Sequence, residues 1–243
     1  MCARVATPAL LCGPSTSPLD IPMAGRSVSD ALVKVYRAFS GVLKPAKIPA
    51  CPCCVTASEV CSLLQTPLRQ LTPEQLSRYA GSVLLTSGSS ADFRYFLPRI
   101  LDISLHERYW YPDREIVLGK LVLADWKSWP NQETQPLMAL FEAAFDETMT
   151  VDDGWDVDSW ICSLALADID VTPFLRKLME PSALPVLIGF FERNSTHLGK
   201  GKLSNSFWKD HKANAAPVVA WFQSTEVQAV VMGHYERLAQ GDV

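Results

Sequence analysis

Four cysteines of this 243-residue chain lie between positions 51 and 61. Cys51 and Cys54 have the C-x-x-C spacing with which two thiolates bind one Zn²⁺. Cys53 lies between them, and Cys61 follows on the next expected helix. A structural zinc site needs four ligands, and the chain has no second C-x-x-C or C-x-x-H pair. The sequence therefore predicts a three- or four-cysteine zinc site formed by Cys51, Cys53, Cys54 and Cys61.

Two other interpretations of this segment stay open. The Cys-Pro-x-Cys pattern resembles the glutaredoxin motif, in which a following helix start lowers a thiol pKa. A thioredoxin-like fold also needs a strand before the motif, and the residues from Lys47 to Ala50 do not have a strand pattern. Alternatively, Pro49 and Pro52 form a rigid turn, and the cysteines pack beside it as small apolar groups. Metal binding, thiol redox chemistry and a purely structural role are thus the alternatives.

A second candidate surface is the aromatic run Tyr109-Trp110-Tyr111, which precedes Pro112. One helix cannot direct three consecutive aromatic side chains into the same core. At least one is therefore expected at an interface or in a groove, where Trp and Tyr are frequent anchors. The alternative is a loop that folds back over the helix ends.

Charge is segregated along the chain, although the formal net charge is only −4. Residues 129–174 contain acidic side chains but no lysine or arginine, whereas residues 193–212 contain five lysines and arginines and one acidic side chain, Asp210. Lys200, Lys202 and Lys209, with Phe207 and Trp208 near them, could contact an anion through charge and stacking. The preferred interpretation is that both stretches are solvated surface or neutralise each other within the fold. The mildly acidic chain disfavours nucleic acid as its partner.

Signatures of catalysis are missing from the sequence. It contains no G-x-S-x-G nucleophile elbow and no P-loop spacing around Lys200. The acidic turn at residues 152–158 lacks the register of a calcium-binding loop. No catalytic residue is therefore assigned, and an enzyme is the disfavoured class.

The elements expected to position these residues are helices. Helix starts are expected at Ser27, at Thr56 with Glu59, at Thr72 with Gln75, at Ser89 or Ser90, and at Pro136. Pro98 is expected to kink or split the helix that contains it. No alternating strand pattern occurs, which excludes doubly wound and barrel enzymes.

This pattern predicts an all-α, multi-helix array. Apolar helix centres around Leu97, Leu137 and Leu184 recur at roughly 40 to 47 residues, near the spacing of two-helix repeats. The array is thus either a short α-solenoid of helical hairpins or an irregular helical globule. Residues 1–22 contain four prolines and are expected to be disordered or an over-long start, with Met23 as an alternative start. Residues 23–243 are expected to form a single all-helical domain.

No apolar run reaches about 18 residues, so a membrane span is not expected. The odd number of cysteines and their crowding favour a reducing, cytoplasmic location. The leading functional hypothesis is a soluble helical protein-interaction or regulatory protein. It would bind a protein partner, or another copy of itself, through the aromatic run or the acidic stretch. The alternative is a metal- or thiol-dependent regulatory protein built on Cys51-Pro52-Cys53-Cys54, with zinc as the candidate cofactor.

Overall fold

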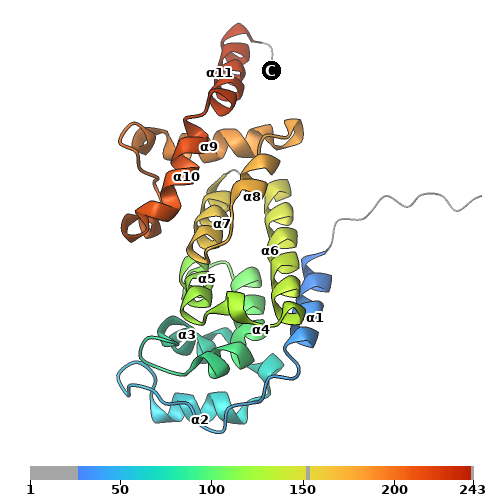
Figure 1. Ribbon diagram of the computed structural model, residues 1–243, viewed down its shortest axis with the longest axis vertical. Helices are drawn as coiled ribbons and strands as arrows, with labels where there is room; N and C mark the ends of the chain where they lie inside the picture. The colour runs from blue at the N-terminus through green and yellow to red at the C-terminus, as the bar shows by residue number, and fades with distance from the viewer. Residues whose placement is uncertain (1–26, 152–153, 242–243) are drawn as a thin grey trace, which may run out of the picture.

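The computed structural model describes residues 27–151 and 154–241. In these residues the chain forms eleven α-helices and four short 3-10 helices, and no strand (Figure 1). The all-α prediction is confirmed. None of these helices has the combination of length and apolar character that crossing a membrane requires. The prediction for residues 1–22 lies outside the described residues and stays a prediction.

The first helices begin where the sequence places polar caps. They are α1 (Val28–Ala38), α2 (Ala57–Gln65), α3 (Pro73–Ser82) and α4 (Ser90–His106). Thr56, Thr72 and Ser89 each accept a hydrogen bond from the backbone N–H three residues on. The side chain of that third residue accepts the N–H of the cap, which completes a capping box. Removal of such an N-cap side chain typically costs about 1 kcal/mol, so these starts are well determined.

The remaining helices are α5 (Arg114–Leu123), α6 (Asn131–Val151), α7 (Trp155–Leu166), α8 (Thr172–Lys177), α9 (Leu184–Leu198), α10 (Lys212–Phe222) and α11 (Thr225–Gln240). The prediction that Pro136 begins a helix is wrong, because α6 begins at Asn131. The backbone N–H groups of Glu133 and Thr134 already donate to the Pro130 carbonyl and close a turn before Pro136. Helix α4 continues through Pro98, so of the two predicted effects splitting is wrong, and a kink stays a prediction. The burial of neighbouring side chains such as Phe96 and Leu97 offsets the hydrogen bond that Pro98 cannot make.

The helices pack into an elongated body with α2 at one end and α11 at the other (Figure 1). The most extensive packing joins α1 to α6 and α5 to α7. Large aromatic side chains fill the centre, where the rings of Phe141 and Trp160 lie 6.4 Å apart and Phe145 packs edge-on against Phe174. In a simple solenoid each hairpin contacts only its neighbours in the chain. The long-range pairing of α1 with α6 departs from that pattern, so the solenoid form stays unconfirmed.

Five of the ten acidic side chains in residues 129–174 form ion pairs, within the described part of the chain, with bases from other parts of the fold. These ion pairs are Arg94–Glu133, Arg114–Asp156, Lys127–Asp168, Lys177–Asp146 and Arg193–Asp158. Asp158 is buried between α7 and α9, where it also accepts a 3.2 Å hydrogen bond from Asn194. Burial raises the pKa of Asp158 despite these partners. These five acidic side chains therefore join segments of the fold that lie apart in the chain.

Candidate metal centre

The cysteine loop, residues 51–54, is a backbone turn placed directly before α2. The Cys54 and Val55 N–H groups donate to the Cys51 carbonyl at 2.9 and 3.0 Å. The Cys51 N–H donates to the Thr86 carbonyl at 2.9 Å, which anchors the loop to the segment between α3 and α4. Four residues of local turn thus bring the three cysteine side chains to one place.

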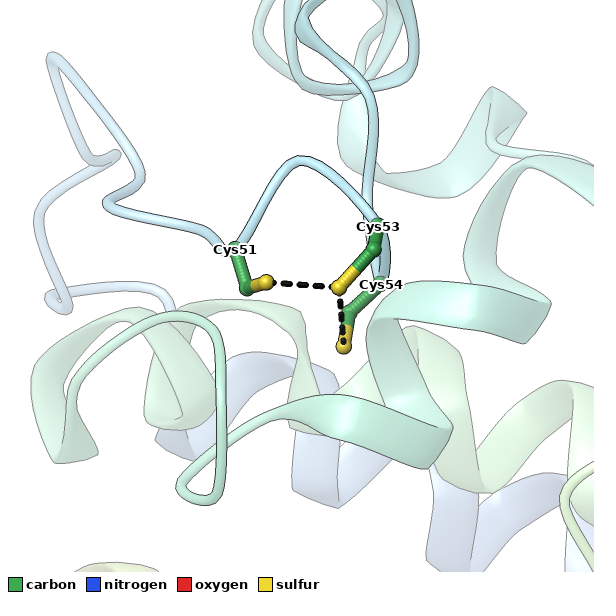
Figure 2. Close-up of side chains that lie close together, drawn as sticks. All are labelled: Cys51, Cys53 and Cys54. Carbon is green, nitrogen blue, oxygen red and sulfur yellow. Dashed lines mark hydrogen bonds between the residues drawn. The ribbon is translucent and has the colours of Figure 1, made fainter.

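The sulfur atoms of the loop converge (Figure 2). Cys51 Sγ lies 2.7 Å from Cys53 Sγ, and Cys53 Sγ lies 3.9 Å from Cys54 Sγ. All three sulfurs are within 4.8 Å of one another. Three sulfurs bound to one tetrahedral Zn²⁺ would stand about 3.8 Å apart, given Zn–S bonds of about 2.3 Å. The Cys53–Cys54 spacing already fits, and the Cys51–Cys53 spacing has to widen by roughly 1 Å.

The fourth predicted ligand, Cys61, is not part of this group. Its thiol lies on α2, is exposed, and falls outside the set of sulfurs that are mutually within 4.8 Å. Elsewhere in residues 27–151 and 154–241, no three His, Cys, Asp or Glu side chains come together in this way. The structure thus brings together three of the four cysteines named from the sequence.

The thiols of Cys51 and Cys53 differ in acidity. The hydrogen bonds from Cys53, and then those from Cys54, lower the pKa of the Cys51 thiol. The same interaction with Cys51, with a further contribution from Cys54, raises the pKa of Cys53 to about 11. Within this pair, Cys51 therefore forms its thiolate more readily than Cys53 does. A thiolate is the form that binds metals, so Cys51 is the natural first ligand.

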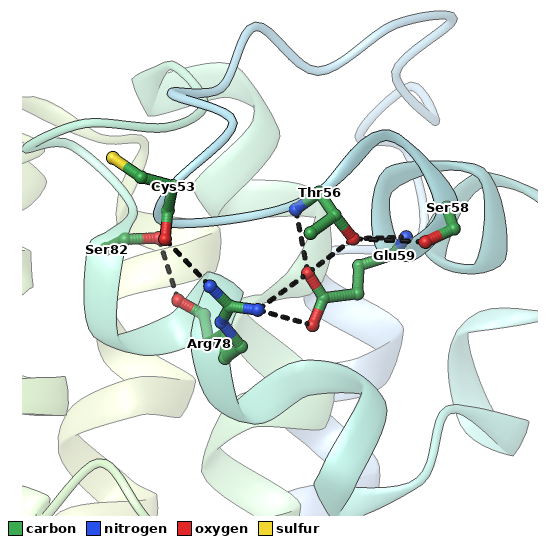
Figure 3. Close-up of polar contacts among 6 residues, drawn as sticks. All are labelled: Cys53, Thr56, Ser58, Glu59, Arg78 and Ser82. Atoms are coloured by element: carbon green, nitrogen blue, oxygen red, sulfur yellow. Dashed lines mark hydrogen bonds and ion pairs between the residues drawn. The ribbon is translucent and has the colours of Figure 1, made fainter.

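Arg78 of α3 ties the cysteine loop to the start of α2 (Figure 3). Its Nη2 donates to the Cys53 carbonyl at 2.8 Å, and its Nη1 lies 3.2 Å from both carboxylate oxygens of Glu59. Glu59 in turn accepts the Thr56 N–H at 2.7 Å, which lowers the pKa of Glu59 together with the charge of Arg78. Sequence reasoning missed Arg78, because no local pattern marks an arginine on a later helix as a partner of this loop.

Substitution of Arg78 by methionine is expected to weaken zinc binding about tenfold while leaving the fold intact. The Cys53 carbonyl would lose its charged donor, so the loop would be held less firmly in the binding geometry. Competition with a chromophoric zinc chelator measures the affinity, and thermal unfolding measures the fold. Lys34→Met on α1 is the matched control. Equal zinc affinities of the Arg78 and Lys34 variants would show that Arg78 does not support the site.

The aromatic run contacts the same helix α3. The Trp110 indole N–H donates to the Pro73 carbonyl at 2.8 Å, in the first turn of α3. The Tyr111 ring covers Gly81, where an added Cβ would lie 2.9 Å from the Tyr111 hydroxyl. Tyr109 is 92% exposed. Two of the three aromatic side chains, those of Trp110 and Tyr111, therefore contact α3, and the side chain of Tyr109 extends into solvent.

The basic residues follow α9. Lys200, Lys202 and Lys209 are exposed, and none of them takes part in an ion pair within the described part of the chain. Trp208 is only 4% exposed, so the expectation that it stacks on a ligand beside these lysines is wrong. Its ring packs into the core instead. Anion binding by the lysines stays a prediction.

These features describe an all-helical protein with a partly exposed cluster of three cysteine thiols. A comparison of the chain with models of protein families, with curated proteins and with solved structures finds no match. The function is therefore argued from the geometry of the chain itself.

Proposed function

We propose that this is a metal-dependent regulatory protein whose cysteine loop binds zinc through Cys51, Cys53 and Cys54. The observation that carries the proposal is the convergence of these three sulfurs within 4.8 Å on a short, anchored turn. Sulfur ligands select soft or borderline metal ions such as Zn²⁺. A reducing cytoplasm, in which thiols persist, suits such a site.

The regulatory part of the proposal rests on the contacts of the loop. Binding of a metal ion would fix the Cys53 backbone, whose carbonyl accepts from Arg78. Arg78 also holds Glu59, the residue that completes the capping box of α2. Zinc occupancy is thereby coupled to the start of α2 and to its packing on α3. Loss of the metal, or oxidation of the thiols, would loosen that end of the molecule.

Zinc affinity is expected to rise steeply with pH between about pH 6 and 8. The pKa of Cys53 is about 11, so this thiol is protonated at neutral pH and has to release its proton when the metal binds. Each proton released lowers the apparent Kd about tenfold per pH unit. Chelator competition at several pH values measures this dependence. An affinity that does not change with pH would contradict thiolate ligation by Cys53.

Protein interaction is a second candidate function, favoured by the exposure of Tyr109. A tyrosine that is 92% exposed beside the half-exposed Tyr111 has the form of an anchor for a partner. Tyr109→Ala is expected to weaken binding of a co-purifying partner by about tenfold or more, with an unchanged melting temperature. Leu43→Ala, at another exposed apolar side chain, is the control. Equal retention of the partner by both variants would exclude Tyr109 as an anchor.

A further inference from the structure

We propose that a second copy of this chain completes the metal centre. Cys61 of each copy would bind the zinc ion held by Cys51, Cys53 and Cys54 of the other. This inference rests on the proposed zinc-binding function and extends it to the fourth ligand and to the oligomeric state. It makes the protein a symmetric dimer whose assembly depends on zinc.

Within the described residues of one copy, the site has only three ligands. Zn²⁺ in structural sites has four protein ligands. The described residues supply three sulfurs, and no histidine, aspartate, glutamate or further cysteine joins the group. Cys53 is exposed, and Cys51 and Cys54 are partly exposed. A fourth ligand can therefore reach the zinc ion from outside the molecule.

Helix α2 directs Cys61 away from its own chain. Leu63, two residues on, is fully buried at 0% exposure and marks the inner face of α2. Two residues along a helix turn the side-chain direction by about 160°, so Cys61 lies on the outer face. Ala57 and Ser58 are also exposed on α2. These side chains are small and uncharged, so this face of α2 adds no charge of its own to a contact with the cysteine loop of a second copy.

The proposed contact between the two copies is symmetric. Each copy would offer the exposed Cys61 thiol and one three-cysteine site. Cys61 of each copy would therefore bind the zinc ion held by the other copy. Reciprocal contacts between identical surfaces close at a two-fold dimer. The arrangement gives four thiolates to each zinc ion and one zinc ion to each chain. Binding is ligand exchange without oxidation: each thiol releases its proton to water as its sulfur binds Zn²⁺.

Complementation between two inactive variants of the full chain tests the proposal. Cys61→Ser keeps the three-sulfur site but has no Cys61 thiolate to offer, whereas the triple variant Cys51→Ser/Cys53→Ser/Cys54→Ser keeps Cys61 but has no site of its own. Each variant alone is expected to bind zinc at least about tenfold more weakly than the unmodified protein and to stay monomeric. An equimolar mixture with zinc is expected to form a dimer that contains one copy of each variant and one tightly held zinc ion. Native mass spectrometry reads both the mass and the zinc content.

The other results separate this inference from the function on which it rests. A mixture that restores neither the dimer nor the zinc ion would overturn the exchange of Cys61 between copies. Zinc binding by Cys61→Ser as tight as that of the unmodified protein would also overturn it, and would leave the three-cysteine site standing. An unmodified protein that binds zinc but stays monomeric would likewise overturn the exchange of Cys61 and leave the three-cysteine site standing. An unmodified protein that does not bind zinc at all would remove both proposals.

Discussion

Replacement of Gly154 by alanine is expected to destabilise the protein by about 2–5 kcal/mol. Gly154 precedes α7 with φ of 95°, a left-handed conformation that a Cβ atom disfavours. A Cβ there would lie 2.2 Å from the Phe190 backbone nitrogen and 2.4 Å from the Gly189 carbonyl carbon. These are backbone atoms of α9 and cannot rotate away. The substitution would therefore separate α7 from α9.

Urea unfolding followed by circular dichroism measures this effect, and Gly119→Ala is the matched control. Gly119 lies inside α5, and an added Cβ would meet no atom within 4 Å. Alanine there is expected to stabilise the helix by about 0.5–1 kcal/mol. Similar unfolding midpoints for the two variants would mean that α7 and α9 do not approach as closely as described.

Replacement of Cys53 by serine is expected to lower zinc affinity by about 100-fold. Structural zinc ions bind with about 10–16 kcal/mol shared among four ligands, so one lost thiolate costs about 3 kcal/mol, or roughly 100-fold. Cys53 is the central sulfur, at 2.7 Å from that of Cys51 and 3.9 Å from that of Cys54. Because Cys53 is exposed, the metal-free fold should not change.

Chelator competition measures the affinity of the Cys53→Ser variant, and circular dichroism checks its helix content. Cys12→Ser is the control, because the proposal gives Cys12 no role. An affinity of the Cys53 variant equal to that of the control would exclude the cysteine loop as the zinc site.

Local features of the fold were predictable from the sequence, and non-local ones were not. The starts of α2, α3 and α4 follow from side chains that bond backbone groups three residues away, as at Thr56 and Thr72. The continuity of α4 through Pro98 and the early start of α6 depend on packing and turns that local rules for proline do not include. The pairing of α1 with α6 joins segments far apart in the chain, and no periodicity indicates it.

In the candidate site too, the local features were predictable from the sequence and the non-local ones were not. Cys51, Cys53 and Cys54 converge because one short turn contains them, and their spacing predicted this. Cys61 does not join them, because its position on α2 places it opposite the buried Leu63. The support from Arg78 comes from another helix, so the sequence could not reveal it. For the run Tyr109-Trp110-Tyr111, the sequence predicted that at least one side chain would lie outside the core. It did not indicate that the most exposed one would be Tyr109.

Elemental analysis of the full-length protein, purified under reducing conditions, tests the central claim most directly. Thiol alkylation before and after addition of a chelator is measured on the same sample. The proposal predicts about one zinc ion per chain, with Cys51, Cys53 and Cys54 protected from alkylation until the chelator removes the metal. A protein that contains no zinc, does not take it up when it is added, and reacts freely at all three thiols would contradict it.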